Sequence, residues 1–235
     1  QRNIRRMLRL VNQLLDFNKL ENDTLKLQVK PIDLITQLRN LTDIFRVTAN
    51  EKGVTFRTYG LEDSLTIWAD EDMLDKICFN LLSNAMKFTP AGGKVEFGLD
   101  VISREEALKF FDLGDKDVDS RYMKVVVKDN GPGIPENQLE RIFDRYYQLE
   151  NQMRGVYNWG TGIGLYFAKT LARMHHGYLK AGNRDEGTGA AFTLLLPISE
   201  SSYADSEKVQ LEVKDGNCPY IVSSVKYTDL PSSMS

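Results

Sequence analysis

Cysteine, histidine and long apolar runs are scarce in this sequence. Its 235 residues include two cysteines and two histidines. Cys78 and Cys218 are too far apart in the sequence to form a metal-ligand spacing, and so low a cysteine content fits a reducing compartment. Cys78 falls on an apolar helical face, where we interpret it as a small core residue.

A membrane-spanning run and a signal peptide are both absent. No segment approaches the roughly 18 consecutive apolar residues of a spanning helix, and the start, "QRNIRRMLRL", has no apolar signal-peptide core. We therefore expect a soluble, cytoplasmic segment. The chain begins without Met in a helical pattern, which is compatible with a piece of a longer protein, and membrane anchoring of that protein (for example in an inner membrane) stays open.

The sequence also lacks an excess of one charge. Its formal net charge is -3, so nothing global indicates nucleic acid or an anionic membrane as a partner. Hydrophobic residues make up 42% and charged residues 27% of the chain. This composition is ordinary for a globular protein with one sizeable core and something smaller.

An amphipathic pattern over residues 2–20 is the first feature that is present. Its apolar residues recur at steps of three and four, which predicts one helix; they are Ile4, Met7, Leu8, Val11, Leu14, Leu15 and Leu20. A lone helix cannot bury such a stripe, so we expect partner helices from a second chain or from upstream residues. The alternative is a helix that packs on its own domain.

The remaining sequence mixes helical and strand patterns. Helices are expected over 32–53, 71–89, the start of 136–148, and 161–176; strands are expected near 54–60, 65–70, 94–102, 122–129, 178–182 and 190–197. Residues 21–31 suggest a linker with a short strand, and 103–121 a surface excursion with a helical turn. The mixture predicts an α+β fold, with one sheet covered on one face by helices.

The composition changes after residue 198. Residues 199–235 are rich in serine and acidic residues, with one hairpin pattern over 208–227. We interpret 199–235 as a linker or tail with weak structure, and an edge strand is the alternative.

Asn80, Asn84 and Lys87 form the first polar cluster. Their spacing of four and three residues places them on one face of the helix expected over 71–89. An asparagine oxygen suits a hard cation such as Mg²⁺, and a lysine supplies a point charge for phosphate. The alternative is that these asparagines are exposed polar positions of an amphipathic helix.

Glycines form two further clusters, each with bare backbone at a junction. Asp129, Gly131 and Gly133 follow the apolar run "MKVVVK", and Gly160, Gly162 and Gly164 lead into the helix expected over 161–176. Backbone N–H groups at a helix N-terminus can hold an anion. The cluster of Gly160, Gly162 and Gly164 fits neither a P-loop nor a dinucleotide-binding fingerprint, because no strand leads directly into it and no Lys-Ser/Thr pair directly follows it. Taken alone, this glycine-rich stretch can equally be a loop.

Taken in order, these stretches resemble a known family. "NLLSNAMKFTP", "DNGPGI", "IFDRYYQ" and "GTGIGL" resemble the N, G1, F and G2 boxes of the sensor histidine kinase catalytic and ATP-binding domain. This family belongs to the superfamily of the gyrase, heat-shock and mismatch-repair ATPases. The resemblance continues through "HHGYLKAGNRDEGTGAAFTLLLP" and implies a catalytic domain over 28–198. Residues 1–27 resemble the second helix of the family's dimerisation and phosphotransfer domain, which implies a homodimer.

The resemblance implies a Bergerat-type ATP-binding sandwich and a role for each motif residue. Asp129 would bind the adenine amino group, Asn84 would bind Mg²⁺, Asn80 would support it, and Lys87 would meet the phosphates. The implied ATP-binding set is Asn84, Lys87, Asp129, Gly131, Gly133, Phe143, Gly160, Thr161, Gly162, Gly164 and Leu165, and the implied catalytic set is Asn80, Asn84, Lys87 and Arg145. Between Gly133 and Gly160 lies the implied ATP lid, anchored by Phe143, from which Arg145 would reach a phosphate.

Position 80 bears on the type of reaction. The related ATPases have a glutamate there that activates water, whereas Asn80 cannot act as a base, which favours phosphoryl transfer over hydrolysis. The family transfers the γ-phosphoryl to a histidine of its helical domain, and then to a receiver domain of a response regulator. We interpret His175 and His176 as structural residues at a helix end, so the acceptor histidine is expected upstream of this chain.

Two other functions remain open at this stage. One is a catalytically silent nucleotide-binding scaffold of the same fold. The other is a related ATPase or serine-type protein kinase, against which Asn80 and the helix expected at 1–20 count. In hybrid members of the family a linker like 199–235 leads to a receiver domain, and whether this protein is such a hybrid stays open.

Overall fold

The structure is a computed structural model that describes residues 22, 24–114, 119–148, 162–185 and 187–209. The helix predicted over 2–20, with its dimerisation role, and most of the predicted hairpin lie outside these residues. None of the described helices is long and apolar enough to cross a membrane.

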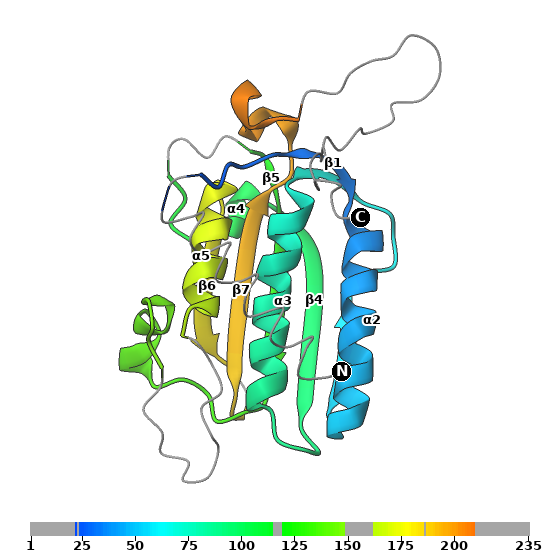
Figure 1. Cartoon of the computed structure of the whole chain (residues 1–235), viewed down its shortest axis with the longest axis vertical. Helices are drawn as coiled ribbons and strands as arrows, with labels where there is room; N and C mark the ends of the chain where they lie inside the picture. Colours follow the sequence, from blue (N-terminus) through cyan, green and yellow to red (C-terminus); the bar gives the residue numbers. More distant parts are fainter. Residues whose placement is uncertain (1–21, 23, 115–118, 149–161, 186, 210–235) are drawn as a thin grey trace, which may run out of the picture.

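A mixed five-stranded sheet forms the centre of the molecule (Figure 1). Its strands, in spatial order, are β2 (Thr55–Tyr59), β4 (Lys94–Ser103), β5 (Arg121–Asp129), β7 (Ala190–Pro197) and β6 (Tyr178–Asn183). Strand β2 runs parallel to β4, and every other neighbouring pair is antiparallel. Because side chains alternate across a strand, one face collects apolar rows; Phe97, Val127 and Phe192 are direct neighbours in one such row and are buried.

Three helices cover that apolar face: α2 (Leu34–Lys52), α3 (Glu71–Phe88) and α5 (Gly164–Met174). Helix α3 is central, packing against both other helices and against β5. Its residues Leu74, Ile77 and Leu81 have no exposed surface, and neither has Cys78. The predicted α+β fold, with helices on one face of the sheet, is confirmed.

Both long helices begin at an aspartate that caps them, and α2 ends at a glycine. Asp33 caps the start of α2, where its carboxylate accepts a hydrogen bond from the Thr36 backbone N–H, and Asp70 does the same for α3 through Met73. Helix α2 ends at Gly53, which has φ 69°. The sequence predicted these two helices within two residues at each end.

Smaller elements complete the domain. Strands β1 (Lys30–Asp33) and β3 (Thr66–Ala69) form a separate antiparallel pair. The short helix α4 (Arg104–Ala107) belongs to the predicted excursion and starts with a capping box at Ser103. It contributes to a second apolar cluster, separate from the main core, made of Ile102, Ala107, Phe111, Leu113, Tyr122 and Leu195.

The region after β5 differs from its prediction. In place of a short helix starting at 136, the structure has two 3-10 turns, η1 (Glu136–Gln138) and η2 (Arg141–Phe143). Ile142 and Phe143 of the second turn are buried in the main core. Tertiary burial of these two side chains, rather than a continuous helical stripe, therefore sets the local backbone.

Residues 199–209, which the sequence analysis placed in a linker or tail, lie against the domain. They include turns η3 (Glu200–Ser202) and η4 (Asp205–Glu207). The buried carboxylate of Asp119 accepts hydrogen bonds from Ile198 and Ser199 N–H and from the Ser199 and Ser202 hydroxyls. A bridge between Val29 and Lys208 joins this segment to the chain that enters the domain.

Candidate functional site

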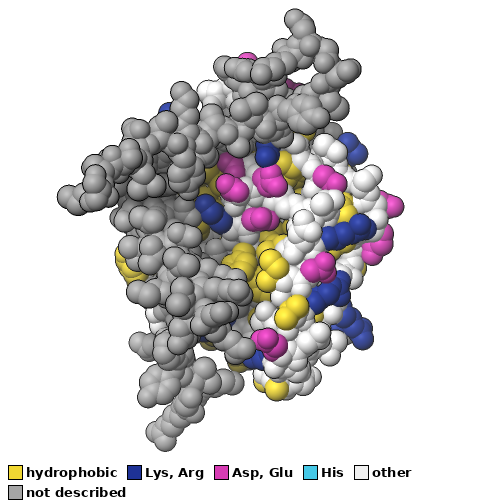
Figure 2. Space-filling model, turned by 45° about the vertical axis from the view of Figure 1, so that its right-hand side comes forward, with side chains coloured by type: hydrophobic (Ala, Val, Ile, Leu, Met, Phe, Trp, Pro, Cys, Tyr) yellow, Lys and Arg dark blue, Asp and Glu magenta, His cyan; other side chains and the backbone are white. Residues whose placement is uncertain are grey.

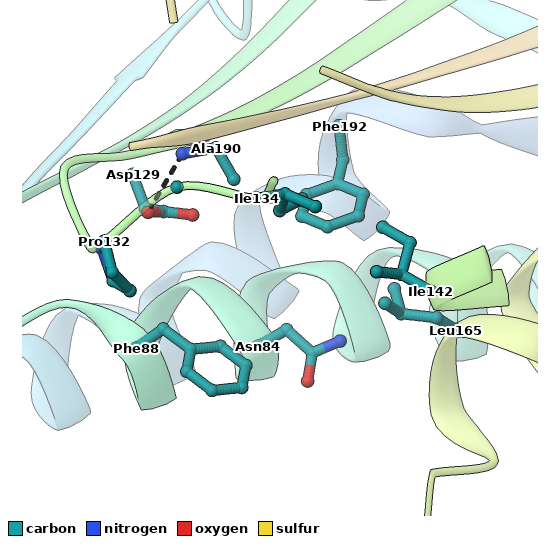
Figure 3. A pocket seen from close by; sticks show the side chains of 10 residues that line it. Asn84, Phe88, Asp129, Pro132, Ile134, Ile142, Leu165, Ala190 and Phe192 are labelled. Atoms are coloured by element: carbon teal, nitrogen blue, oxygen red, sulfur yellow. Dashed lines mark hydrogen bonds between the residues drawn. The ribbon is translucent and has the colours of Figure 1, made fainter. Parts of the chain in front are cut away.

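A pocket opens between α3, the loop after β5, and α5. It is lined by Asn84, Phe88, Asp129, Pro132, Gly133, Ile134, Ile142, Leu165, Ala190 and Phe192. Most of these residues are apolar, with one carboxylate and one amide among them (Figure 3). An apolar cleft with few, fixed polar groups is the usual form of a small-molecule site.

Asp129 is the last residue of β5 and is 4% exposed. Its Oδ1 accepts hydrogen bonds from the backbone N–H of Gly131 (2.8 Å) and Ala190 (3.3 Å). The second oxygen, Oδ2, has no hydrogen bond to any described residue and lies on the pocket side (Figure 3). The carboxylate thus offers one fixed acceptor to a ligand.

Burial raises the pKa of the Asp129 carboxyl above its ordinary value. The N–H groups of Gly131 and Ala190 and the charge of Arg184 act in the opposite direction, because they stabilise the ionised form. The site therefore holds a carboxylate in surroundings that only partly compensate its lost hydration.

Two glycines allow the backbone to turn at this carboxylate. A Cβ atom on Gly131 would lie 2.9 Å from the Phe88 carbonyl oxygen. Gly133 has φ 77°, a conformation that disfavours other residues. Gly133 thus lines the pocket, and Gly131 lies against the backbone of Phe88 at the end of α3.

Asn84 and Asn80 occupy different places although they share one face of α3. Asn84 is half-buried, lines the pocket, and its side chain makes no hydrogen bond within the described part of the chain. Asn80 is buried, donates to the Lys76 carbonyl oxygen (2.8 Å), and lies against the start of α5, where a Cβ on Gly164 would be 2.8 Å from its Oδ1. The amide of Asn84 is therefore available to a ligand, and Asn80 packs one turn away.

Lys87 lies one turn further along α3, outside the pocket lining. Its ammonium is 4.7 Å from the centre of the Phe88 ring, and Phe88 is 43% exposed at the pocket edge. The structure thus places a positive charge beside the pocket rather than in its wall.

The first turn of α5 forms another side of the site. Ile163 occupies the N-cap without a side-chain hydrogen bond to the helix, and Leu165 lines the pocket. Gly162 has φ 69°, and its carbonyl oxygen accepts a hydrogen bond from Tyr146 N–H (3.1 Å). An uncapped helix start suits an anion. The predicted residues Gly160 and Thr161 lie outside the described residues.

Phe143 and Arg145 belong to the segment predicted as a lid. Phe143 is 5% exposed and meets the Phe192 ring edge-on, with 6.4 Å between the ring centres. Arg145 is exposed; it donates to the Tyr166 hydroxyl (2.9 Å) and lies over that ring. The structure therefore holds Phe143 in the core beside the pocket but places Arg145 against α5, away from the pocket lining.

Sequence reasoning missed two residues that shape the site. A Cβ on Gly189, whose φ is 130°, would lie 1.9 Å from the Asp129 carbonyl oxygen. Asn183, at the end of β6, makes two hydrogen bonds to the backbone of Ile134. Gly189 stands in the "GTG" before a strand, a local signal for close backbone approach, whereas no local pattern marks Asn183.

His175 is a structural residue, as the sequence indicated. It has no exposed surface; its Nδ1 lies 2.9 Å from the Leu171 carbonyl oxygen, and its Nε2 accepts from Asp70 N–H (3.2 Å). This pairing requires the neutral Nδ1–H tautomer, and burial lowers the pKa of the ring. His176, nearby, contacts the Glu207 carboxylate at 3.0 Å. Both ring nitrogens of His175 are engaged, so it cannot accept a phosphoryl group.

Among the described residues, no group of three or more histidine, cysteine or acidic side chains could hold a metal ion. In the pocket, the side-chain oxygens that could bind a cation are those of Asn84 and Asp129, and Asn84 is the one that the resemblance assigns to it. That arrangement fits Mg²⁺, which usually keeps few protein ligands and binds substrate phosphates.

Comparison with known proteins agrees with this geometry. Residues 69–200, more than half of the chain, match the family described as "Histidine kinase-, DNA gyrase B-, and HSP90-like ATPase". "Histidine kinase P4" of Formosa agariphila is 30% identical over 203 residues, which are 86% of this chain and 14% of that protein. "Sensor histidine kinase WalK" of Bacillus subtilis is 32% identical over 205 residues, which are 87% of this chain and 31% of that protein. The chain thus spans less than a third of either relative.

Solved structures show the same fold. Full-length ShkA, solved in complex with AMPPNP, has a TM-score of 0.64 and 28% identity, covering 83% of this chain and 36% of that one. The catalytic domain of histidine kinase ThkA has a TM-score of 0.56 and 21% identity, covering 75% of this chain and 99% of that one. The chain belongs to the histidine kinase-, DNA gyrase B- and HSP90-like ATPase family and contains an ATP-binding catalytic domain of the histidine kinase type.

Proposed function

We propose that this chain transfers the γ-phosphoryl group of ATP to a histidine on a helical domain upstream of it. The observation that carries the proposal is the pairing of Asp129 with Asn84 across one pocket, an acceptor for a base on one side and an amide for a cation on the other. Asn80 supports transfer rather than hydrolysis, because its amide cannot deprotonate water.

Each polar residue has a task in the proposed reaction. Asp129 Oδ2 accepts a hydrogen bond from the adenine amino group, and the apolar walls exclude water from the base. Asn84 holds Mg²⁺, which supplies charge neutralisation for the phosphates. The N–H groups at the start of α5, with Lys87, stabilise the negative charge of the triphosphate.

Arg145 needs a change of position to take part. It lies against Tyr166 in this structure, so we propose that the lid segment moves it to a phosphate when ATP binds. Phe143 is the fixed point of that movement, because it is buried between the pocket and β7.

The acceptor and the partners follow from the same proposal. His175 is excluded as the nucleophile because its ring is buried and both ring nitrogens are hydrogen-bonded. We propose that the acceptor histidine lies on an upstream helix that pairs with residues 1–20 in a homodimer, and that a receiver domain takes the phosphoryl group onward.

Calorimetric titration tests the nucleotide site. We expect Mg²⁺ to tighten ATP binding to the chain, Asn84→Ala to lose that gain, and Asn40→Ala, an exposed asparagine on α2, to keep it. If the wild-type chain binds no ATP with or without Mg²⁺, the pocket is not a nucleotide site.

Labelled ATP tests the transfer step in the full-length parent protein. With γ-labelled ATP we expect an acid-labile, alkali-stable phosphoprotein, as phosphohistidine gives, which the Asn84→Ala variant does not form. Binding without transfer would support the silent scaffold, and steady phosphate release by the chain alone would support an ATPase.

A further inference from the structure

Asn183 connects two parts of the sheet that are not neighbours. It is the last residue of β6, and strand β7 separates β6 from β5. The loop after β5 crosses the end of β7 and reaches Asn183, 49 residues away in sequence from its partner Ile134. The contact therefore depends on the tertiary fold alone.

The side-chain amide of Asn183 pairs with one backbone residue in both directions. Ile134 N–H donates to Asn183 Oδ1 (2.8 Å), and Asn183 Nδ2 donates to the Ile134 carbonyl oxygen (2.7 Å). An amide side chain can accept through its oxygen and donate through its nitrogen at the same time, as this pairing requires. Asn183 Oδ1 also lies 3.0 Å from the place where a Cβ on Gly133 would be, so the amide contacts the turn directly.

The residues held by this amide are pocket wall. Pro132, Gly133 and Ile134 all line the pocket opposite Asn84. On the other side of Asn183, Arg184 N–H donates to the Gly189 carbonyl oxygen (3.0 Å), and Gly189 packs against Asp129. The turn that carries Asn183 is thus tied to both the wall and the base-binding carboxylate.

We propose that Asn183 is a positioning residue for the nucleotide, which fixes the wall Pro132–Ile134 beside Asp129 before the ligand binds. It does not touch the reacting atoms. Its effect is preorganisation, because a wall already held in place loses less conformational freedom on binding. The inference rests on the proposed use of this pocket for ATP.

Substitutions at Asn183 separate positioning from folding. Asn183 is exposed at the end of an edge strand, so its variants should keep the fold. We expect Asn183→Ala to weaken ATP binding about three- to tenfold, from the loss of two hydrogen bonds that order the wall. Asn183→Asp, although nearly equal in shape, should weaken ATP binding less than Asn183→Ala, because it keeps the acceptor for Ile134 N–H while its carboxylate repels the Ile134 carbonyl oxygen.

Two readouts and one matched control make the test specific. Calorimetry should show a higher Kd with unchanged stoichiometry, whereas a misfolded fraction would lower the stoichiometry at constant Kd. Amide exchange at Ile134 should accelerate in Asn183→Ala and stay protected in Asn183→Asp, which keeps the acceptor. The control Lys180→Ala, at an exposed position on the same strand, should change neither the Kd for ATP nor the amide exchange at Ile134.

The outcomes distinguish this inference from the proposed function. If wild-type protein binds ATP and Asn183→Ala binds it equally well, Asn183 does not position the wall. A lower stoichiometry at unchanged Kd would overturn the inference in the same way. If wild-type protein binds no ATP, the proposed function itself fails.

Discussion

Replacing Asp129 with asparagine separates the two roles of this carboxylate, which are to accept backbone hydrogen bonds through Oδ1 and to offer Oδ2 as an acceptor to a ligand. The change keeps the side-chain shape, and the asparagine oxygen can still accept from Gly131 and Ala190, as Oδ1 does now. On the pocket side, an NH₂ donor replaces the acceptor Oδ2. In the proposed ATP complex this donor would face the adenine amino group, which is also a donor.

The expected loss of ATP affinity follows from one hydrogen bond to a charged group. Such a bond contributes about 1.5–3 kcal/mol, which corresponds to a roughly 10- to 150-fold increase in Kd. The affinity of the wild-type protein, relative to Asp129→Asn, should also fall on acidification at a higher pH than for an ordinary aspartate, because burial raises the pKa of Asp129. Dividing the wild-type affinity by that of Asp129→Asn at each pH cancels the effect of protonation of ATP itself.

The stability of the fold should not fall with the ATP affinity when Asp129 is replaced by asparagine. A carboxyl group whose pKa is higher in the folded than in the unfolded chain destabilises the fold once the pH exceeds the unfolded value. At neutral pH, Asp129→Asn removes this cost, so the free energy of unfolding in urea should stay equal or increase. A variant that binds ATP as tightly as wild type, or that unfolds more easily, would refute this account of Asp129.

Two further substitutions test how the site is held in the fold. Gly189→Ala should lower the free energy of unfolding by about 2–5 kcal/mol in urea titrations, because its Cβ would overlap the Asp129 carbonyl oxygen at an unfavourable φ. The control Gly187→Ala, at a positive φ but in open space, should lower it by only about 1 kcal/mol. Equal losses in the two variants would contradict the overlap argument. Asp119→Ala should cost about 3–5 kcal/mol at pH 7, because it leaves the N–H and hydroxyl donors of residues 198–202 without their acceptor. Burial raises the pKa of Asp119, but hydrogen bonds led by those from Ser199 outweigh burial and lower the pKa in the folded protein. The ionised carboxylate therefore stabilises the fold above its unfolded pKa, and the difference in unfolding free energy between wild type and Asp119→Ala should shrink as the pH falls below about 4. A difference that stays constant with pH would show that the charge is not involved.

Local chemistry was sufficient to predict most of the framework. Asp33, Asp70 and Gly53 mark helix ends through their own short-range hydrogen bonds and φ, so their sequence signals are direct. The apolar runs of β4, β5 and β7 report the burial of these central strands. The motif order predicted which stretches meet at a pocket, and the structure brings Asn84, Asp129, Gly133 and Leu165 together there.

Other features of the site arise from contacts between distant residues. The 3-10 turns around Phe143 replaced a predicted helix because burial of two side chains decided the backbone. Arg145 and Lys87 lie outside the pocket lining, with their cations beside the rings of Tyr166 and Phe88. Such competition between neighbours does not show in a motif.

The sequence by itself determined the long helices, most of the strands and the set of candidate site residues. Only the tertiary structure decided that Asn183 holds the wall at Ile134, that Asp119 holds residues 198–202, and that His175 joins α5 to the start of α3. These contacts span between 49 and 105 residues of chain. Periodicity and capping act over only a few residues, so a polar side chain that bonds to backbone so far away leaves no local pattern.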